Sequence, residues 1–497
     1  PRLSRLTTSL SGIAPAAAGA AAGHHRVLLI AATLLTTALL SWHPRSQAVV
    51  LVYLALGAWI LFRHPRAILP SLLLAGVLVP FRIGTGTGSA INVAMLVVGG
   101  FMLAQVPRLL LHQSLRLRPS VANAPWLALV VLAGLSIVSG AATWNPWVNT
   151  KDNFLIVQLG QWSLFILPAG AYLMTGIYLK QRSELGQLTR LIYLLAAGRI
   201  VGWLLLDPYL QRWGILTGPV MFIWLAAVCA ASALFLTQWT LGRRALAAGA
   251  ALCTVALPFA YGQDWKSGWL PTLVGLVAVA SLWLWKHSRR AVMAIYLVIL
   301  VLGPAAYLLL RGLAADDAWS LDTRLIAFRG LAQLLEGRWL AGLGLAAYWH
   351  YWRDVMGQMS YIDPDTGYFH YTFAPTVNMH NNYLDVLGQM GVLGLLAFAW
   401  LLAALALQAF RCFRAEAPGF GRAYAAACMG GITGMAVAGM LGDWVIPFVY
   451  NIGLNGFRDS FLAWILLGGL SLLDATRGET LHVDPLAPAS PSTVTLP

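Results

Sequence analysis

One histidine stands where a long, partly hydrophilic segment ends and a strongly apolar stretch begins. The sequence reads His380-Asn381, then nine residues, then Gly391-Val392-Leu393-Gly394 leading into the apolar run. Imidazole is the side chain whose ordinary pKa suits general-base catalysis near neutral pH. His380 is therefore a candidate base at a membrane surface. The structural alternative is that His380 caps a helix while Gly391 and Gly394 allow close helix packing.

Three basic residues could bind an anionic group. Arg324 opens a segment with helical apolar periodicity, Lys266 precedes an apolar run, and Arg199 lies inside one. A charge inside an apolar span costs at least ~2.5–3.5 kcal/mol, so Arg199 is expected to face the interior of a helix bundle. Each also has a structural alternative. Arg324 could be a solvated helix charge, Lys266 a snorkelling residue at the interface, and Arg199 a partner of Asp207 or Asp443.

A metal site is not expected from the sequence. The histidines and acidic residues that invite one have spacings that match no common ligand pattern; they are His350, Asp363, Asp365 and His370. The four cysteines lie in apolar runs or a short basic loop, without the spacing of metal ligands or of a disulfide framework. We expect neither a metal nor another cofactor.

The composition excludes an ordinary soluble domain. Of the 497 residues, 59% are hydrophobic and 10% are charged, whereas soluble domains have roughly 45–50% and about 25%. The net charge of +14 comes from basic residues that stand singly or in pairs between apolar runs. This arrangement is typical of the positive-inside rule in a multispanning protein and does not indicate a nucleic-acid partner.

Apolar runs of nearly membrane-spanning length follow one another along most of the chain. A helix needs about 20 apolar residues to cross a hydrocarbon core of ~30 Å. About fourteen runs approach that length, and two of them are short. They lie near 27–42, 48–62, 67–81, 89–106, 124–142, 154–179, 187–206, 219–239, 245–261, 268–285, 291–310, 384–410, 424–442 and 458–474. The sequence therefore predicts an all-α polytopic membrane protein with about 12–14 transmembrane helices.

Basic residues are concentrated in alternate loops, as at Arg243-Arg244, which places both ends of the chain in the cytoplasm. The predicted parts are a cytoplasmic segment 1–26, eleven spans in 27–310, a large periplasmic loop 311–383, further spans in 384–474 and a disordered tail 475–497. Loops as long as 311–383 are seldom passive connectors.

Within this loop, apolar residues at helical spacing predict an amphipathic helix over 322–336, with Ser320 or Asp322 as its N-cap and Gly337 as its stop. The apolar positions are Leu321, Leu325, Phe328, Leu331 and Leu335. Aromatic residues gather in 348–352 and 361–373, and are suited to the membrane interface or to stacking on sugar rings.

The two motifs together resemble a known family. His380-Asn381, followed after nine residues by Gly391 and Gly394 at the end of a long outer loop, is similar to the motif of the bacterial O-antigen ligase/polymerase family of integral-membrane glycosyltransferases. That family also shows an arginine that opens an amphipathic helix, and then a P-x-x-G-x-G turn. Here Arg324 opens the helix, and 340–344 (Leu-Ala-Gly-Leu-Gly) supplies the glycines without the proline. The resemblance covers roughly 260–410.

The resemblance implies the transfer of an undecaprenyl-diphosphate-linked glycan to an acceptor hydroxyl, without a metal, at the periplasmic face of the bacterial inner membrane. His380 would be the base, and Arg324 would bind the diphosphate. Arg199, inside an apolar run, is a further candidate for binding the diphosphate by its position and not by the resemblance. Family members commonly have Ser-Arg-Gly before a middle span, where this chain has Lys266-Ser267-Gly268. Lys266 would then supply the charge. The acceptor could be a glycan, a lipid or a protein.

A different class of function stays open. A lipid-linked oligosaccharide flippase or a secondary transporter would also have many spans and a charge such as Arg199 within one of them. The chain shows no inverted repeat and no paired, interrupted spans of the kind such transporters have. The long outer loop also favours the enzyme.

Overall fold

The computed structural model describes residues 68–79, 82–85, 89–112, 117–150, 153–213, 219–260, 266–285, 287–298, 301, 327–359, 361–362, 364–367, 369–370 and 379–476. The chain divides into two compact units, 1–68 with 79–81 and 69–78 with 82–497. Only Ile68 and Val79 of the first unit are described. Apart from Ile68, the described helices and strands therefore lie in the second unit.

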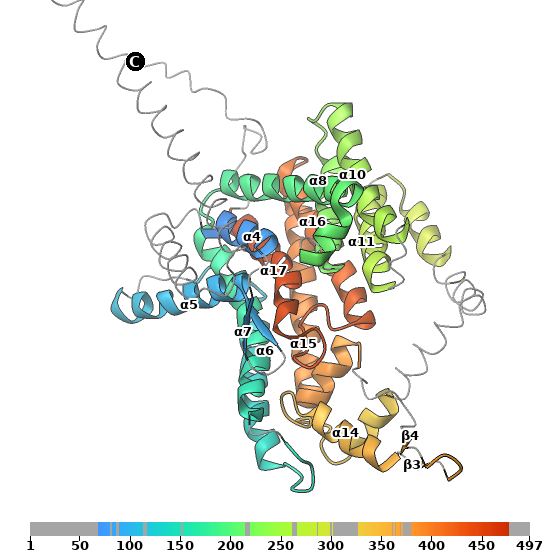
Figure 1. Ribbon diagram of the computed structural model, residues 1–497. Coiled ribbons are helices and arrows are strands. Elements are labelled where there is room, and N and C mark those ends of the chain that lie inside the picture. The colour runs from blue at the N-terminus through green and yellow to red at the C-terminus, as the bar shows by residue number, and fades with distance from the viewer. Residues whose placement is uncertain are drawn as a thin grey trace, which may run out of the picture. The chain divides into compact units, whose positions relative to one another are not determined.

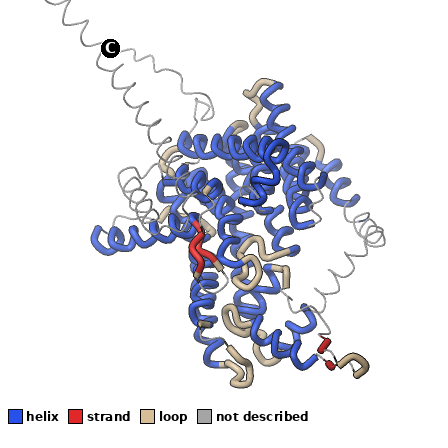
Figure 2. Tube along the Cα trace, in the orientation of Figure 1, coloured by secondary structure: helices blue, strands red, loops and turns tan. Residues whose placement is uncertain are grey.

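The described chain is mostly helical (Figures 1 and 2). The helices are α4 (Ile68–Leu78), α5 (Val93–His112), α6 (Asn123–Ala142), α7 (Phe154–Tyr178), α8 (Arg182–Trp213), α9 (Pro219–Phe235), α10 (Leu241–Ala260), α11 (Lys266–Trp285), α14 (Tyr348–Met359), α15 (Asn382–Ala415), α16 (Phe420–Leu441) and α17 (Gly456–Ala475), with a 3-10 turn η2 (Gly453–Asn455). The strands form two small antiparallel hairpins, β1 (Arg82–Gly84) with β2 (Ala90–Asn92) and β3 (Tyr361–Ile362) with β4 (Phe369–His370).

Seven of the described helices are long and apolar enough to cross a membrane. They begin or end within a few residues of the apolar runs, as in 154–179 for α7 and 424–442 for α16. The prediction of an all-α polytopic protein is confirmed at this level. The count of 12–14 spans stays a prediction, because the runs 27–42 and 48–62 lie outside the described residues.

Two groups of helices meet in the described bundle. In the first group, α9 packs against α10, α11 and α16, and α15 packs against α6 and α16. In the second, α17 packs along α7, and Trp464 on α17 meets Trp126 on α6 with ring centroids 4.9 Å apart. Nearly all of α17 is buried, so it is a core helix of the bundle.

One end of the bundle is held together by an ion pair. Arg182, at the start of α8, donates two hydrogen bonds of 2.8 Å to the carboxylate of Glu416, just after α15. It also donates to the Thr476 carbonyl at the end of α17, at 2.6 Å. The segments that meet here are all predicted to be cytoplasmic. We call this the Arg182 end.

The opposite end, which we call the His380 end, gathers the segments 143–150, 343–351 and 443–455. The Tyr351 hydroxyl accepts a hydrogen bond of 3.0 Å from the Asn145 amide. His350 contacts the Asn149 carbonyl through Nδ1 at 3.2 Å and the Tyr450 hydroxyl through Nε2 at 3.0 Å. Because α7, α15 and α17 all end at the Arg182 end, their first residues lie at the His380 end.

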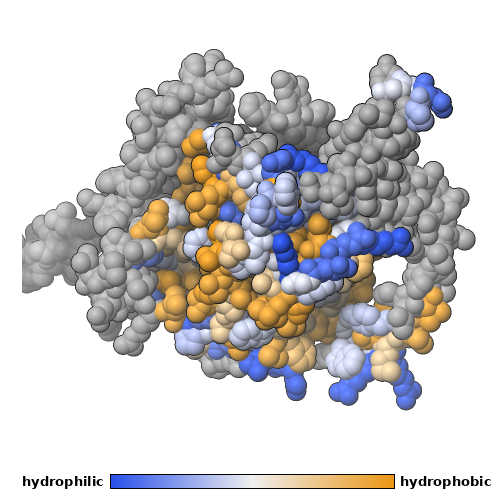
Figure 3. Space-filling model, turned by 90° about the horizontal axis from the view of Figure 1, so that it is seen from below, coloured by the Kyte–Doolittle hydropathy of each residue, from blue (hydrophilic) through white to orange (hydrophobic). Residues whose placement is uncertain are grey.

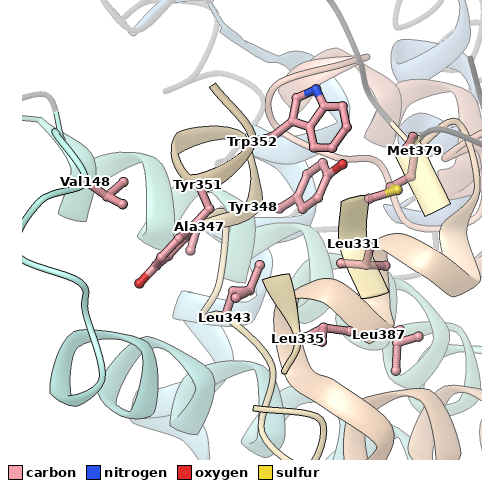
Figure 4. Packing of buried hydrophobic residues seen from close by; sticks show 11 residues of the cluster. Val148, Leu331, Leu335, Leu343, Ala347, Tyr348, Tyr351, Trp352, Met379 and Leu387 are labelled. Atoms are coloured by element: carbon pink, nitrogen blue, oxygen red, sulfur yellow. The ribbon is translucent and has the colours of Figure 1, made fainter. Parts of the chain in front are cut away.

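A separate hydrophobic core lies at the His380 end (Figure 4). Residues 327–334 are helical, and Gly337 has a φ of 72° in the turn that follows, close to the predicted end at 336. The predicted start of this helix at 322 and its N-cap candidates lie outside the described residues. Leu331 and Leu335 are buried in this core, as expected. The prediction for Phe328 was wrong. Its side chain is 45% exposed, because Ala327, one residue earlier, occupies the buried face.

The aromatic residues of 348–352 differ from expectation. Tyr348, Tyr351 and Trp352 are buried in the same core and do not form an exposed surface. A helix of α14's composition buries one side against its neighbours, and large rings fill the space between 327–334 and the loop after α6. Trp349 is half-buried and stacks on Tyr450, with ring centroids 5.9 Å apart.

Candidate functional site

The glycine turn at 340–344 and the motif that follows His380 are in direct backbone contact. The Leu343 amide donates to the Gly388 carbonyl at 2.9 Å, and the Gly344 amide donates to the Gln389 carbonyl at 3.1 Å. The Val392 amide donates to the Trp339 carbonyl at 2.8 Å. Two motifs about fifty residues apart in the sequence thus form one structural unit.

Glycine is required at two positions of this contact. Gly391 has a φ of 65° and breaks α15, and a Cβ there would run into the backbone of Leu340 and Ala341. Gly342 has a φ of 77°, and its Cβ would lie 2.6 Å from the Gln389 carbonyl oxygen. Both glycines therefore allow a close backbone approach in a conformation that other residues rarely adopt. Gly394 is buried against the Met390 side chain within α15.

The break at Gly391 separates a spanning segment from a projecting one. Residues 392–415 rise through about 36 Å at 1.5 Å per residue, which is enough to cross a hydrocarbon core of about 30 Å. The first turns of α15, 382–390, lie on the His380 side of that break. His380 precedes them and lies at the His380 end of the bundle.

His380 is held in an uncommon backbone conformation. Its φ is 44°, in the left-handed region that non-glycine residues seldom occupy, and its side chain is half-buried. The next residue, Asn381, caps α15, and its side-chain oxygen accepts from the amides of Tyr383 at 3.0 Å and Leu384 at 3.2 Å. The cap at Asn381 and the left-handed conformation of His380 together fix the position of the imidazole just before α15. Such strained residues cluster at functional sites.

The imidazole of His380 connects to a buried carboxylate through one amide. Nδ1 of His380 lies 3.4 Å from Nδ2 of Asn451, and the same Nδ2 donates a short hydrogen bond to Oδ1 of Asp443. Asp443 is 1% exposed, and its Oδ2 accepts from the Phe448 amide at 2.8 Å. Burial raises the pKa of the Asp443 carboxyl to about 6, against the opposing effect of its hydrogen bonds, which include one from the Ile452 amide.

A second carboxyl group lies beside Asp443. Asp385, in the first turn of α15, is 6% exposed and close enough to Asp443 for the two groups to interact electrostatically. No described residue donates a hydrogen bond to the Asp385 carboxyl. The buried Tyr348 hydroxyl also interacts electrostatically with Asp385 and has no hydrogen-bond partner among the described residues. Burial raises the pKa of Tyr348 well above its ordinary value.

The helix that begins at Lys266 runs antiparallel to α16. Gly434 lies against the Pro271 carbonyl, and Gly430 lies against the Gly275 carbonyl. This register, continued toward the start of α11, brings the backbone of Lys266 level with the last turn of α16.

The last turn of α16 lies at the same height along the bundle as the His380 site. Gly439, in the last turn of α16, lies against Asn382 and Tyr383, which follow the motif histidine. The structure thus brings the backbone of Lys266 to the same end of the bundle as His380. The side chain of Lys266 is not among those described.

Arg199 is buried in α8, at 2% exposure, as expected for a charge in an apolar helix. Its guanidinium lies over the ring of Trp203 at 4.3 Å from the centroid and over that of Phe222 on α9 at 5.1 Å. Asp443, one of the suggested partners, accepts hydrogen bonds from the Phe448 amide and from Asn451. The side chain of Asp207 and all of Arg324 lie outside the described residues.

The sequence did not identify the residues that adjoin His380. Asn451 and Asp443 lie beyond the next apolar run, and no local pattern joins them to the histidine. A usable signal existed in Asp385 and Asp443, which are acidic residues at the edges of apolar runs and are rare there unless they have a role.

Seen from below, where α14 lies in Figure 1, hydrophobic and hydrophilic residues alternate over the described surface (Figure 3). Such a mixture suits a surface at the level of lipid headgroups. Among the described residues, no group of three or more His, Cys, Asp or Glu could hold a metal ion. His350 contacts Tyr450 and Asn149, and of the other residues considered as ligands, the side chain of His370 and all of Asp363 are not described.

No protein-family model matches the chain, and none of the curated proteins matches it.

Proposed function

We propose that the chain is a membrane glycosyltransferase of the O-antigen ligase or polysaccharide polymerase type, acting at the periplasmic face of the bacterial inner membrane. It would move a glycan from an undecaprenyl diphosphate to an acceptor hydroxyl without a metal. The observation that carries the proposal is the position of His380, half-buried at the end of the apolar bundle and connected through Asn451 to buried Asp443.

The chemistry follows from the leaving group. Breaking the bond between sugar and diphosphate develops negative charge on the diphosphate, which a cation nearby stabilises. The start of α11 lies at the level of His380, so Lys266 is in a position to supply one charge, with Arg324 and Arg199 as the further cations of the proposal. His380 would accept the proton of the acceptor hydroxyl as that oxygen attacks the anomeric carbon and the diphosphate departs. A single displacement inverts that carbon.

A transfer assay with purified protein and a lipid-linked donor tests the proposal. His380→Ala should reduce transfer by roughly 10²–10⁴-fold, the contribution of a positioned base. The matched control is His287→Ala, since His287 is exposed and its ring hydrogen-bonds only to the Trp283 carbonyl among the described residues. Residual activity within about tenfold of wild type would contradict the role of His380.

The same donor separates the rival function. A flippase moves the lipid-linked glycan across the bilayer and leaves the bond between sugar and diphosphate intact. In proteoliposomes, the measurement is whether uncleaved donor moves from one leaflet to the other. Such movement, together with no glycosylation of the acceptor, would favour the flippase and overturn the enzyme.

A further inference from the structure

We propose that the turn at 338–340 is a lipid-binding element at the His380 end. Arg338, with Tyr351 beside it, binds a phosphate group that is carried by an apolar chain, while Trp339 and Leu340 lie among the chains of that leaflet. The inference does not rest on the proposed function, since a transferase and a flippase would carry this site equally well.

The turn lies where α15 begins its long apolar run. The Trp339 carbonyl accepts from the Val392 amide at 2.8 Å, and the Leu340 carbonyl accepts from the Leu393 amide at 3.4 Å. The chain then carries no charged residue until Arg411. About 20 helical residues cross a hydrocarbon core of ~30 Å. Counted back from Arg411, that length ends at the break in α15, which places the turn at the boundary of the hydrocarbon core.

The exposed side chains of the turn are apolar, like those of the helix beside it. Leu340 is 65% exposed and Trp339 is 43% exposed, and the first turns of the apolar run expose Leu393 and Leu396. Because the backbones of Leu340 and Leu393 are hydrogen-bonded, the exposed apolar surface of α15 extends onto the turn. An exposed apolar side chain on a membrane-spanning helix faces lipid, and tryptophan is typical of the membrane interface. The partner of the turn is therefore the bilayer.

Arg338 presents a fixed positive charge next to this apolar surface. Its side chain is half-buried, its Nη1 donates to the Tyr351 hydroxyl at 2.7 Å, and its guanidinium lies over the Tyr351 ring at 5.2 Å from the centroid. A guanidinium has five N–H donors, and only this one has a partner among the described residues. No ion pair joins Arg338 to an acidic side chain in the described part of the chain, and Glu336 nearby is exposed.

The Tyr351 hydroxyl provides a second donor. It accepts hydrogen bonds from Arg338 and from the Asn145 amide at 3.0 Å, so its own O–H is left to donate. Within the described ranges, no residue accepts that hydrogen bond. Tyr351 is 5% exposed, and Figure 4 shows its hydroxyl pointing away from Tyr348 and Trp352. A buried donor without an acceptor is costly, and a phosphate oxygen bound by Arg338 would accept from it.

The ligand that fits both parts of the turn is a phosphate on an apolar chain. Arginine binds phosphate oxygens through parallel N–H donors and keeps its charge at physiological pH. The exposed Leu340 and Trp339 add the apolar contact that a free phosphate would not use. The headgroup phosphate of a bilayer lipid and the diphosphate of a lipid-linked substrate share this chemistry.

The depth of the turn is measured by the accessibility of a nitroxide label in proteoliposomes. The label is placed on Leu340→Cys, in a background where the partly exposed Cys253 is replaced by alanine. We expect more collisions with oxygen, which dissolves in the bilayer, than with a water-soluble nickel chelate. Leu396→Cys is the control in the bilayer, and Asp365→Cys, at an exposed turn, is the control in water. A Leu340 label as accessible to nickel as the Asp365 label would overturn the proposal.

Binding of the phosphate is measured by native mass spectrometry of the protein in a detergent with a sugar headgroup. The probes are phosphatidylglycerol, undecaprenyl diphosphate and inorganic phosphate. Arg338→Gln should weaken the binding of a lipid phosphate by about tenfold or more, and Arg338→Lys by less, because it keeps the charge. Tyr351→Phe removes one donor and should weaken binding by a smaller factor. Arg329→Gln is the matched control, since Arg329 is exposed in the same segment.

The three probes separate the sources of the phosphate. Weakened binding of phosphatidylglycerol alone would identify a bilayer lipid, and weakened binding of undecaprenyl diphosphate alone would identify the lipid-linked substrate; either result supports the site. Unchanged binding of both lipids in folded Arg338→Gln would overturn it, as would inorganic phosphate bound as tightly as either lipid. If Arg338→Gln fails to fold, the label on Leu340→Cys still decides. Neither measurement uses glycan transfer, so a chain without transferase activity would lose the proposed function and keep this site.

Discussion

The Leu343 amide donates to the Gly388 carbonyl at 2.9 Å, and this bond joins the glycine turn of the long segment to the helix that follows His380. The glycines of this turn therefore have a structural role, which is to let the turn bind the backbone of α15. The turn fixes the position of the first turns of α15, which carry polar side chains of the site. Backbone hydrogen bonds between the two segments are insensitive to side-chain identity, apart from the glycines that permit the approach.

Gly391→Ala should destabilise the protein and abolish transfer. The new Cβ meets the Leu340 backbone, and the residue must keep a positive φ, so we expect a loss of at least ~2 kcal/mol. The measurement is the melting temperature in detergent alongside the transfer rate. Gly242→Ala is the matched control, because a Cβ at Gly242 meets nothing within 4 Å. A Gly391→Ala protein with the melting temperature of wild type would refute this account of the motif.

Much of the helical framework could be predicted from the sequence, since membrane-spanning helices need long apolar runs and little else. The site could be predicted only in part. His380 stood out because it lies at the edge of such a run, whereas Asn451 reaches it only after α16 returns the chain to the same end. The face of 327–334 was misjudged because apolar residues in that segment are too frequent for periodicity to decide between Ala327 and Phe328.

The orientation of the bundle can be tested with introduced cysteines. Trp147→Cys and Asp365→Cys lie in exposed positions of segments predicted to be periplasmic, and Gly242→Cys lies exposed before the basic pair Arg243-Arg244. In spheroplasts, a membrane-impermeant thiol reagent should label the first two and spare the third. Cys253 is partly exposed and is replaced by alanine in the background. Labelling of Gly242→Cys alone would invert the topology and move His380 to the cytoplasmic side.

Stability should depend on pH through Asp443. Burial raises the pKa of this carboxyl from 3.8 to about 6, so the folded protein binds the proton more tightly than the unfolded chain does. The resulting stabilisation is fully present below pH 3.8 and is lost as the pH rises through 6, with a total of about 3 kcal/mol at most. The melting temperature of wild type should therefore fall between pH 5 and pH 7.5 by more than that of Asp443→Asn. Asp365→Asn, at an exposed turn, should follow wild type.

Transfer should be unaffected by excess chelator. No cluster of described side chains has the donors for a metal ion, and the proposed leaving-group stabilisation depends on fixed cations. Activity is compared before and after dialysis against EDTA. A loss that Mg²⁺ or Mn²⁺ restores would show that a metal takes part, with Asp363 and Asp365 as the first ligands to examine.

The last prediction concerns the cations that would hold the diphosphate. If Lys266 neutralises the leaving group, Lys266→Arg should retain substantial transfer and Lys266→Ala should lose most of it, because the need is for positive charge at that place. A lysine that only reaches the membrane interface would give a different result, with alanine changing expression and little else.

Arg324 provides the matched comparison in the same assay. A guanidinium that holds the diphosphate through two parallel hydrogen bonds is poorly replaced by a lysine, so Arg324→Lys should be strongly impaired. A solvated helix charge would accept that change freely. Competition with free pyrophosphate separates binding from folding, since it should inhibit wild type and lose effect in both alanine variants. Full activity in both Lys266→Ala and Arg324→Ala would remove the anion site, and with it most of the case for a diphosphate leaving group, because His380 alone does not distinguish one glycosyl donor from another.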